Sequence, residues 1–160
     1  MKIGVLGYIG SCNIGDYIQT KAVIDIIYPT NYKVLDRESL HTFDDIEIKT
    51  IINGWFMENP KNWPPNAKIS PLFISFHINP NAENEFLKPK SLNYLKKFEP
   101  IGCRDTYTQN LLQSNGVKSY YSSCITTTFE RKKYLDTSIK PKGVVVIGAF
   151  DRLNPNIDFT

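Results

Sequence analysis

The sequence predicts an α/β protein with a Rossmann-like, doubly wound and mostly parallel sheet. Strand-like and helix-like segments alternate along its 160 residues, which is the pattern that builds parallel sheets. The segment 72–78 (LFISFHI) is almost continuously apolar, as expected of a strand that is covered on both faces. Glycines and polar residues follow several strand-like segments, at the sheet edge where ligands bind in this fold class.

The first half of the chain contributes three predicted strands and one helix. Residues 2–7 (KIGVLG) form a short buried strand that leads into a glycine-containing loop. We expect a helix from Asp16, whose carboxylate complements the positive helix end, and Pro29 stops it. Its apolar residues recur at helical spacing: Ile18, Ala22 and Ile26, with Val23 and Ile27 beside them. Two further strands are predicted at 32–35 and 50–53.

The second half continues the alternation after a proline-rich stretch. Prolines recur between Glu58 and Pro71, which predicts a loop there. After the strand at 72–78, we expect Ser91 to cap a helix that carries Leu92, Leu95 and Phe98. The remaining predicted elements are a strand at 101–103, a helix at 105–115 with Tyr107, Leu111 and Leu112 inward, closed by Gly116, and a strand at 117–121.

The composition changes after residue 129. Residues 130–142 are polar and carry Pro141, which predicts a linker and leaves residues 1–129 as one Rossmann-like domain. The segment 143–149 (GVVVIGA) is strongly apolar and predicts another strand. We expect residues 143–160 to supply either the first strand of a second domain or an edge strand added to the first sheet.

Charge and cysteine content narrow the class of protein. Lysine and arginine number 19 against 16 acidic residues and are scattered, whereas a nucleic-acid binder concentrates them on one face. The three cysteines are an odd number without CxxC spacing, which argues against a disulfide framework or a zinc site. No segment approaches the length of a membrane span. We therefore expect a cytoplasmic protein without a nucleic-acid partner, with any membrane contact being peripheral.

The first candidate site is the loop from Gly7 to Asp16 (GYIGSCNIGD). Its glycines let the backbone approach a ligand, and the helix beyond it presents a positive end that attracts anions. The loop is neither GxGxxG nor a Walker loop. A tight turn that Asp16 caps, with no ligand, is the alternative interpretation.

Two further candidates lie at the ends of the central strands. Asn53-Gly54-Trp55 combines a sharp turn with a flat indole face suited to a sugar ring or a base, although a structural tryptophan is equally common. His77 ends the segment 72–78, where an imidazole can act as a general acid or base. The alternative for His77 is a purely structural histidine.

The last two candidates follow the remaining strands. In Gly102-Cys103-Arg104-Asp105, Arg104 can hold a phosphate or carboxylate while Asp105 caps the next helix, or the two can simply pin the turn together. The hydroxyl-rich segment 122–128 (SSCITTT) suits sugar hydroxyls, or is simply a polar loop. Cys124 has no histidine adjacent in sequence, so we do not expect a thiol nucleophile.

Taken in order, these motifs resemble the amino-terminal half of the polysaccharide pyruvyl transferase family. The matching elements are Asn13-Ile14-Gly15-Asp16, Asn53-Gly54-Trp55, Gly102-Cys103-Arg104-Asp105 with Thr108, and Cys124 followed by Thr126 and Thr128. The resemblance covers roughly residues 3–129. It implies a GT-B-like architecture of two Rossmann-like halves, and transfer of a pyruvyl group from phosphoenolpyruvate to glycan hydroxyls in surface polysaccharide synthesis.

This resemblance also implies roles for individual residues. Ketal transfer needs a cationic group for the donor, an acid for its methylene carbon and a base for the attacking hydroxyl. We assign Asp16 and His77 to proton transfer and Arg104 to an anion contact. The other predicted substrate-binding residues are Asn13, Gly15, Asn53, Gly54, Trp55, Cys124 and Thr126. No cofactor or metal is expected, and the acceptor is a glycan or lipid-linked oligosaccharide.

Three other functions remain open at this stage. One is a non-catalytic glycan-binding half-domain, and another is a GT-B glycosyltransferase that uses a nucleotide sugar. The third, an NAD-dependent oxidoreductase, has an acidic residue in place at Asp36 but lacks the required glycines. The sequence also leaves open whether chains associate into a homo-oligomer.

Overall fold

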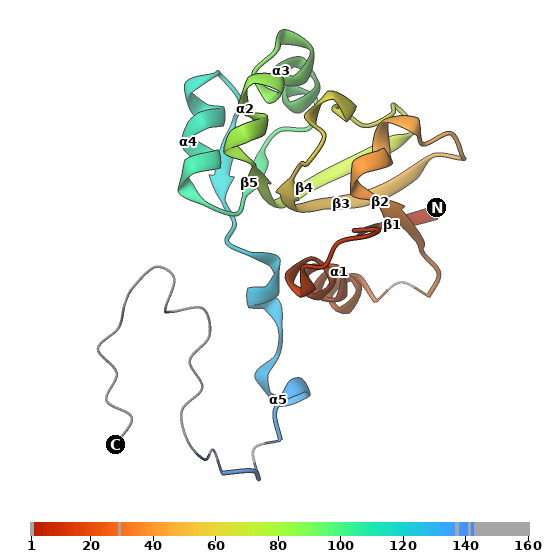
Figure 1. Ribbon diagram of the computed structural model, residues 1–160, viewed down its shortest axis with the longest axis vertical. Coiled ribbons are helices and arrows are strands. Elements are labelled where there is room, and N and C mark those ends of the chain that lie inside the picture. Colours follow the sequence, from red (N-terminus) through yellow and green to blue (C-terminus); the bar gives the residue numbers. More distant parts are fainter. Residues whose placement is uncertain (1, 29, 137, 141, 143–160) are drawn as a thin grey trace. The chain divides into compact units, whose positions relative to one another are not determined.

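The computed structural model describes residues 2–28, 30–136, 138–140 and 142. The chain divides into two compact units, Met1–Phe129 and Glu130–Thr160. The first unit holds the sheet and its helices (Figure 1). In the second, the described residues include one short helix, α5 (Arg131–Tyr134), within the predicted linker. The predicted strand at 143–149 lies outside the described residues.

The first unit is built on six parallel strands in the order β2-β1-β3-β4-β5-β6. This all-parallel α/β sheet confirms the predicted fold class. The strand order reverses between β1 and β3, and such a switch point is where open α/β sheets bind ligands. The strands are β1 (Lys2–Gly7), β2 (Lys33–Asp36), β3 (Ile48–Phe56), β4 (Ile69–Ile78), β5 (Ile101–Cys103) and β6 (Ser119–Tyr121).

Helices cover the two faces of the sheet unequally. One face carries α1 (Ile14–Ile27), whereas α2 (Glu83–Phe86), α3 (Pro89–Lys96) and α4 (Thr106–Ser114) lie on the other (Figure 1). The described residues also include four short 3₁₀ helices: η1 (Arg37–Thr42), η2 (Pro60–Asn62), η3 (Pro80–Ala82) and, after β6, η4 (Ile125–Thr128). Among the described residues, no helix is long and apolar enough to span a membrane.

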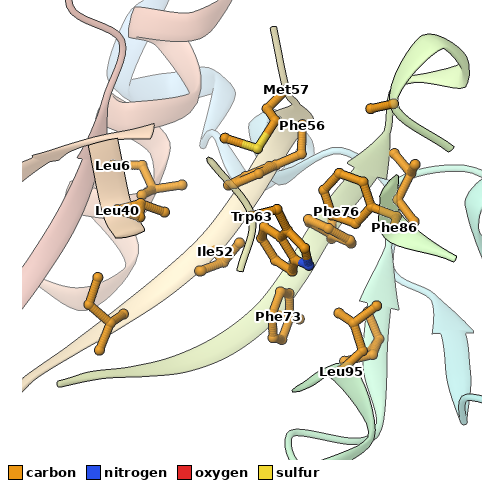
Figure 2. Packing of buried hydrophobic residues seen from close by; sticks show 14 of the residues in the cluster. Leu6, Leu40, Ile52, Phe56, Met57, Trp63, Phe73, Phe76, Phe86 and Leu95 are labelled. Atoms are coloured by element: carbon orange, nitrogen blue, oxygen red, sulfur yellow. The ribbon is translucent and has the colours of Figure 1, made fainter. Parts of the chain in front are cut away.

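An aromatic cluster forms the centre of the larger core (Figure 2). Trp63, from the segment between β3 and β4, is almost fully buried. Its ring lies 4.5 to 5.8 Å from those of Phe56, Phe76, Phe86 and Tyr94. The proline-rich segment, which the sequence predicts to be a loop, therefore anchors β3 and β4 to the helices of this face.

Two elements differ from their sequence predictions for identifiable reasons. Strand β4 begins at Ile69 and includes Pro71, which pairs with Thr50 of β3. On its other side β4 pairs with β5 only at Phe76, so Pro71 is not required to donate a hydrogen bond there. Ser91 is not a cap but lies inside α3, where its hydroxyl donates to the Glu85 carbonyl, and Pro89 starts the helix instead.

Helix α1 turns a different face to the sheet than its apolar pattern predicts. Ile18 and Ile26 are 40% and 45% exposed, whereas Asp16 and Gln19 are buried together with Ala22 and Val23. The tertiary position of the helix therefore overrides the isoleucine stripe. As a result, two polar side chains one helical turn apart point toward the carboxyl ends of the strands. Tyr107 of α4, expected inward, is likewise 41% exposed.

Candidate functional site

The loop between β1 and α1 is held by its own polar side chains. Asn13, not Asp16, is the N-cap of α1, and its side-chain oxygen accepts a hydrogen bond from the Gly15 amide at 2.9 Å. Asp16 lies in the first turn, where its Oδ2 accepts a hydrogen bond from the Ser11 hydroxyl at 2.7 Å. This arrangement fixes a buried carboxylate at the positive end of a 14-residue helix.

Asp16 faces a hollow of about 330 Å³ at the switch point of the sheet. Residues from four segments of the chain surround this hollow, which we call the switch-point hollow. They are Ser11, Asn13, Asp16, Gln19, Arg37, Trp55, Glu58 and Arg104. It thus combines carboxylates, two guanidinium groups and an indole ring.

Arg37 holds one wall of the switch-point hollow in place. Its guanidinium carbon lies 4.8 Å from the centroid of the Tyr8 ring and 5.1 Å from that of Trp55. Its Nε donates to Glu38 at 2.7 Å, and one terminal nitrogen donates to the Trp55 carbonyl at 3.0 Å. Glu38 in turn accepts hydrogen bonds from the backbone amides of Glu58 and Asn59. Arg37 is therefore largely committed to positioning Trp55 and the loop after β3.

A β-bulge lies beside this wall, where β3 and β4 change register. Ile52 pairs with Phe73 but Gly54 pairs with Phe76, so β4 carries one extra residue. Ser75, in the extra stretch, has a φ of 59° and Gly54 a φ of 82°. Asn53-Gly54-Trp55 is consequently inside β3 rather than in a turn after it. Asn53 and Ser75 are fully buried, and their side-chain polar atoms have no hydrogen-bond partner among the described residues.

Gly54 makes room for two side chains of the site. A Cβ atom at this position would lie 2.7 Å from Gln19 Oε1 and 2.7 Å from the Tyr8 hydroxyl oxygen. Both distances are shorter than a van der Waals contact, and the positive φ also favours glycine. The absence of a side chain at Gly54 therefore lets Gln19 and Tyr8 pack against the bulge.

His77 lies next to the hollow and not in its wall. Its Nδ1 bonds to Asp105 Oδ2, and the other oxygen of Asp105 accepts from the Thr108 amide at 2.8 Å as the N-cap of α4. Arg104 Nε lies 3.9 Å from the same Asp105 Oδ2. Asp105 thereby connects His77 to Arg104, which does line the hollow.

These contacts set the protonation states of the pair. Burial lowers the pKa of His77 below its usual value and the Arg104 charge lowers it further, while Asp105 opposes both. Burial by itself would raise the pKa of Asp105, but hydrogen bonds from Thr108 and His77 hold that pKa below its usual value. Near neutral pH the pair is a carboxylate and a neutral imidazole. With Nδ1–H donated to Asp105, Nε2 is the basic nitrogen.

Tyr8 contacts both Arg37, which lines the hollow, and Asn53 at the bulge. Burial raises the pKa of Tyr8 well above its usual value; Arg37 and Arg104 oppose this rise, and Asp16 and Cys124 add to it. Tyr8 therefore stays neutral, and charged groups from the first, second and fifth strand ends surround it. Its hydroxyl donates to the Asn53 carbonyl at 3.3 Å.

Cys124 and Thr126 lie in the segment after β6. Cys124 caps η4, and the Thr126 hydroxyl donates to its sulfur at 3.2 Å. Neither residue belongs to the lining of the switch-point hollow. Their predicted role in substrate binding remains a prediction.

The structure brings some of the predicted residues together and separates others. Asn13, Asp16, Trp55 and Arg104 line one hollow, and Gly15 lies beside it in the first turn of α1. Asn53 and Gly54 lie behind its wall, and His77 is connected to it through Asp105.

Three lining residues lie outside the predicted sites: Gln19, Arg37 and Glu58. Ser11 belongs to the predicted loop from Gly7 to Asp16 but was not singled out. Helical spacing from Asp16 could have indicated Gln19, and the rule that strand ends carry sites could have indicated Arg37 and Glu58.

The described residues contain no group of three or more His, Cys, Asp or Glu side chains that could hold a metal ion. What the site offers is a buried carboxylate, hydrogen-bond acceptors, an aromatic ring and arginine side chains at a switch point. Fold and site together define a doubly wound α/β protein with a polar hollow at the switch point of its sheet.

A comparison with family models identifies the family. Residues 13–157 match the model described as "Polysaccharide pyruvyl transferase". The match covers most of the chain, so the protein belongs to the polysaccharide pyruvyl transferase family. Neither the curated proteins nor the solved structures include a significant match to the chain.

Proposed function

We propose that this protein takes part in transferring a pyruvyl group from phosphoenolpyruvate to hydroxyls of a glycan, and that the switch-point hollow holds the acceptor. The observation that carries the proposal is the joint lining of that hollow by Asp16, Trp55 and Arg104 in a chain of this family. The acceptor is a glycan or a lipid-linked oligosaccharide used in surface polysaccharide synthesis. The proposed location of the reaction is the cytoplasm, and the proposed architecture of the complete enzyme is GT-B-like.

The lining favours an acceptor over an anionic donor. Asp16 and Glu58 are carboxylates, and the Arg37 guanidinium is already bonded to Glu38 and the Trp55 carbonyl. The guanidinium of Arg104 makes a weaker contact than that of Arg37: its Nε lies 3.9 Å from Asp105 Oδ2. A hydroxyl-rich sugar satisfies the carboxylates as a donor and stacks on the partly exposed Trp55 ring. In the family, important arginine and histidine residues for phosphoenolpyruvate lie in the second half.

The reaction consumes two acceptor hydroxyls and releases one phosphate. The first hydroxyl oxygen bonds to the enol carbon of the donor while a proton reaches the methylene carbon, which becomes a methyl group. The second hydroxyl oxygen then bonds to the same carbon, and phosphate departs with the remaining proton. In this proposal, Asp16 accepts the proton of the attacking hydroxyl, because it is the buried carboxylate in the hollow.

His77 and Arg104 act next to that carboxylate. His77 is the second proton-transfer group, since its neutral imidazole has a basic Nε2 and Asp105 holds its orientation. Arg104 contacts the anionic part of the donor and stabilises the charge that develops on the departing phosphate. Asn13 and Gly15 shape the mouth of the hollow through the capped start of α1.

The experiment measures phosphate release and ketal formation from phosphoenolpyruvate with a panel of glycan acceptors. We expect Asp16→Asn to lower turnover by roughly 10²- to 10⁴-fold, as for loss of a general base. The change is isosteric, and the amide oxygen can still accept the Ser11 hydrogen bond. His77→Gln and Arg104→Met should also lower turnover, whereas Asp44→Asn, on an exposed carboxylate bonded to Lys68, is the matched control. Unchanged turnover in all three site variants would remove the proposed site.

A non-catalytic glycan-binding role is the second candidate, and the acceptor-rich lining itself favours it. Binding of a glycan without phosphate release in the same experiment would support that role. Phosphate release that depends on the acceptor would exclude it.

A further inference from the structure

A second hollow, of about 200 Å³, adjoins the switch-point hollow. Residues 8–11, residues 36–38 and Glu58 line this second hollow. Ser11, Arg37 and Glu58 also line the switch-point hollow, so the two hollows share part of their walls. By itself the second hollow is smaller than typical ligand pockets, which enclose roughly 300–1,000 Å³. It therefore extends the neighbouring hollow and does not form a separate site.

One wall of aromatic rings and a guanidinium group continues through both hollows. The guanidinium carbon of Arg37 lies 4.8 Å from the centroid of the Tyr8 ring and 5.1 Å from that of Trp55. Trp55 lines the switch-point hollow, Tyr8 lines the second hollow, and Arg37 lines both. Tyr8 and Arg37 are 3% and 4% exposed, so packing holds this wall in place. A ligand that follows the wall from Trp55 toward Tyr8 passes from one hollow into the other.

The carboxylates that line the second hollow differ in what they bind. Asp36 accepts a hydrogen bond from the Ser39 hydroxyl at 2.8 Å. Glu38 accepts from Arg37 Nε at 2.7 Å and from two backbone amides of the loop after β3. Glu58, by contrast, is exposed, and no hydrogen bond or ion pair joins its carboxylate to another described residue. The carboxylate available to a ligand is therefore that of Glu58, a residue that both hollows share.

Solvent reaches the second hollow along the loop after β1. Ile9 is 80% exposed, and Gly10 beside it is exposed as well. Gly10 has a φ of 80°, and a Cβ atom built on it would meet no atom beyond its chain neighbours within 4 Å. This part of the rim is therefore open, and a ligand can enter the second hollow without displacing the packed wall.

We propose that the second hollow binds the sugar unit that follows the one in the switch-point hollow, so that the protein recognises two consecutive units of an oligosaccharide. The inference rests on the proposed function only in taking the ligand to be a carbohydrate. Hydroxyl groups of the two units donate hydrogen bonds to the Glu58 carboxylate at the shared wall. Arg37, the cation in the lining of the second hollow, is already bonded to Glu38 and to the Trp55 carbonyl. A neutral, hydroxyl-rich unit therefore suits this hollow better than an anionic group.

The probes are methyl glycosides of glucose, galactose, mannose and N-acetylglucosamine, together with the 1,3-, 1,4- and 1,6-linked disaccharides of each sugar. Ligand-observed NMR gives their dissociation constants for the full chain. We expect the best-bound glycoside to gain roughly fivefold to tenfold in affinity when the second unit is added in an accepted linkage, which is the effect of about one hydrogen bond. Equal affinity for every single sugar and its disaccharides would overturn the inference.

Chemical-shift mapping of the isotope-labelled chain locates the second unit. The disaccharide should shift the backbone amides of Gly10 and Asp36, which line the second hollow, whereas the single sugar should leave these two amides unchanged. Additional shifts that lie outside residues 8–11, residues 36–38 and Glu58 would overturn the inference.

Glu58→Ala tests the shared carboxylate. The Glu58 side chain is exposed and its carboxylate has no partner among the described residues, so its removal should leave the urea midpoint of unfolding unchanged. We expect the dissociation constant of the disaccharide to rise roughly tenfold, the loss of a hydrogen bond to a charged group. Glu47→Ala is the matched control, because Glu47 is also an exposed glutamate and lines neither hollow. Unchanged affinity of Glu58→Ala for the disaccharide would overturn the inference.

The proposed function and this inference can fail separately. Disaccharide binding that depends on Glu58, without pyruvyl transfer from phosphoenolpyruvate, would support the second hollow and contradict the proposed function. Pyruvyl transfer with the same acceptor KM for a single sugar and its disaccharides would support the proposed function and overturn the inference. Failure of every glycoside to bind the wild-type chain would also overturn the inference.

Discussion

Gly54→Ala tests the packing on which the inner wall of the hollow depends. An added Cβ would sit in a backbone conformation with a φ of 82°, which costs an L-residue about 1–2 kcal/mol. It would also lie 2.7 Å from two atoms. The end of the Gln19 side chain can turn aside, but the buried Tyr8 ring cannot, and overpacking of this kind costs roughly 1–3 kcal/mol.

The expected total for Gly54→Ala is a loss of about 3 kcal/mol in the free energy of unfolding, since a smaller unfolded-state entropy returns about 0.5 kcal/mol. For a chain of this size that corresponds to a fall in Tm of roughly 6–12 °C. Urea denaturation followed by circular dichroism gives the free energy, and a thermal scan gives Tm.

Gly116→Ala is the control that separates the two contributions. Gly116 has a φ of 71°, but the nearest atom to its added Cβ is the flexible end of Lys96 at 3.5 Å. It should lose only about 1 kcal/mol, from backbone strain. A double-mutant cycle with Tyr8→Phe should then recover about 1 kcal/mol of the Gly54→Ala loss, because the clashing oxygen is gone. Equal losses at Gly54 and Gly116, without recovery in the Tyr8→Phe background, would refute the reasoning.

Three further predictions concern charges and the core. Arg104→Met should raise the pKa of His77, since Arg104 lowers it, and Asp105→Asn should lower that pKa further; NMR titration of the two histidines measures both, and shifts in the opposite directions would contradict the assigned contacts. The depressed pKa of His77 also predicts that unfolding free energy falls as pH drops below about 6.5, because the unfolded state then binds the extra proton. This His77 contribution should vanish in His77→Gln, and an identical pH profile for the two proteins would exclude it. Trp63→Ala should cost about 3–5 kcal/mol by urea denaturation, and a loss below about 1 kcal/mol would contradict its central place in the core.

The sequence alone predicts the parallel sheet but not the β-bulge between β3 and β4. The strands predicted at 2–7 and 101–103 have the bounds that the structure shows. Each is an apolar run bounded by polar residues, which fixes where the strand begins and ends. The β-bulge could not be predicted, since Asn-Gly is an equally good turn signal, and only the pairing of β3 with β4 decides between the two.

The same limit applies to the site. The rule that ligands bind at strand ends pointed to Asp16, Trp55 and Arg104, and these three residues line one hollow. Gln19 was not predicted because the isoleucines of α1 indicated a different buried face for the helix. His77 was indicated by position, but its bond to Asp105 depends on how α4 docks.

The proposed function requires that a carbohydrate binds in the switch-point hollow. Backbone and side-chain chemical-shift mapping of the isotope-labelled chain, titrated with the best-bound glycoside, tests it most directly. We expect the largest shifts at the Trp55 indole and at the amides of Ser11, Gln19 and Arg104. Shifts concentrated instead around Ile3 and Leu72, which line a separate hollow of about 380 Å³, would contradict it.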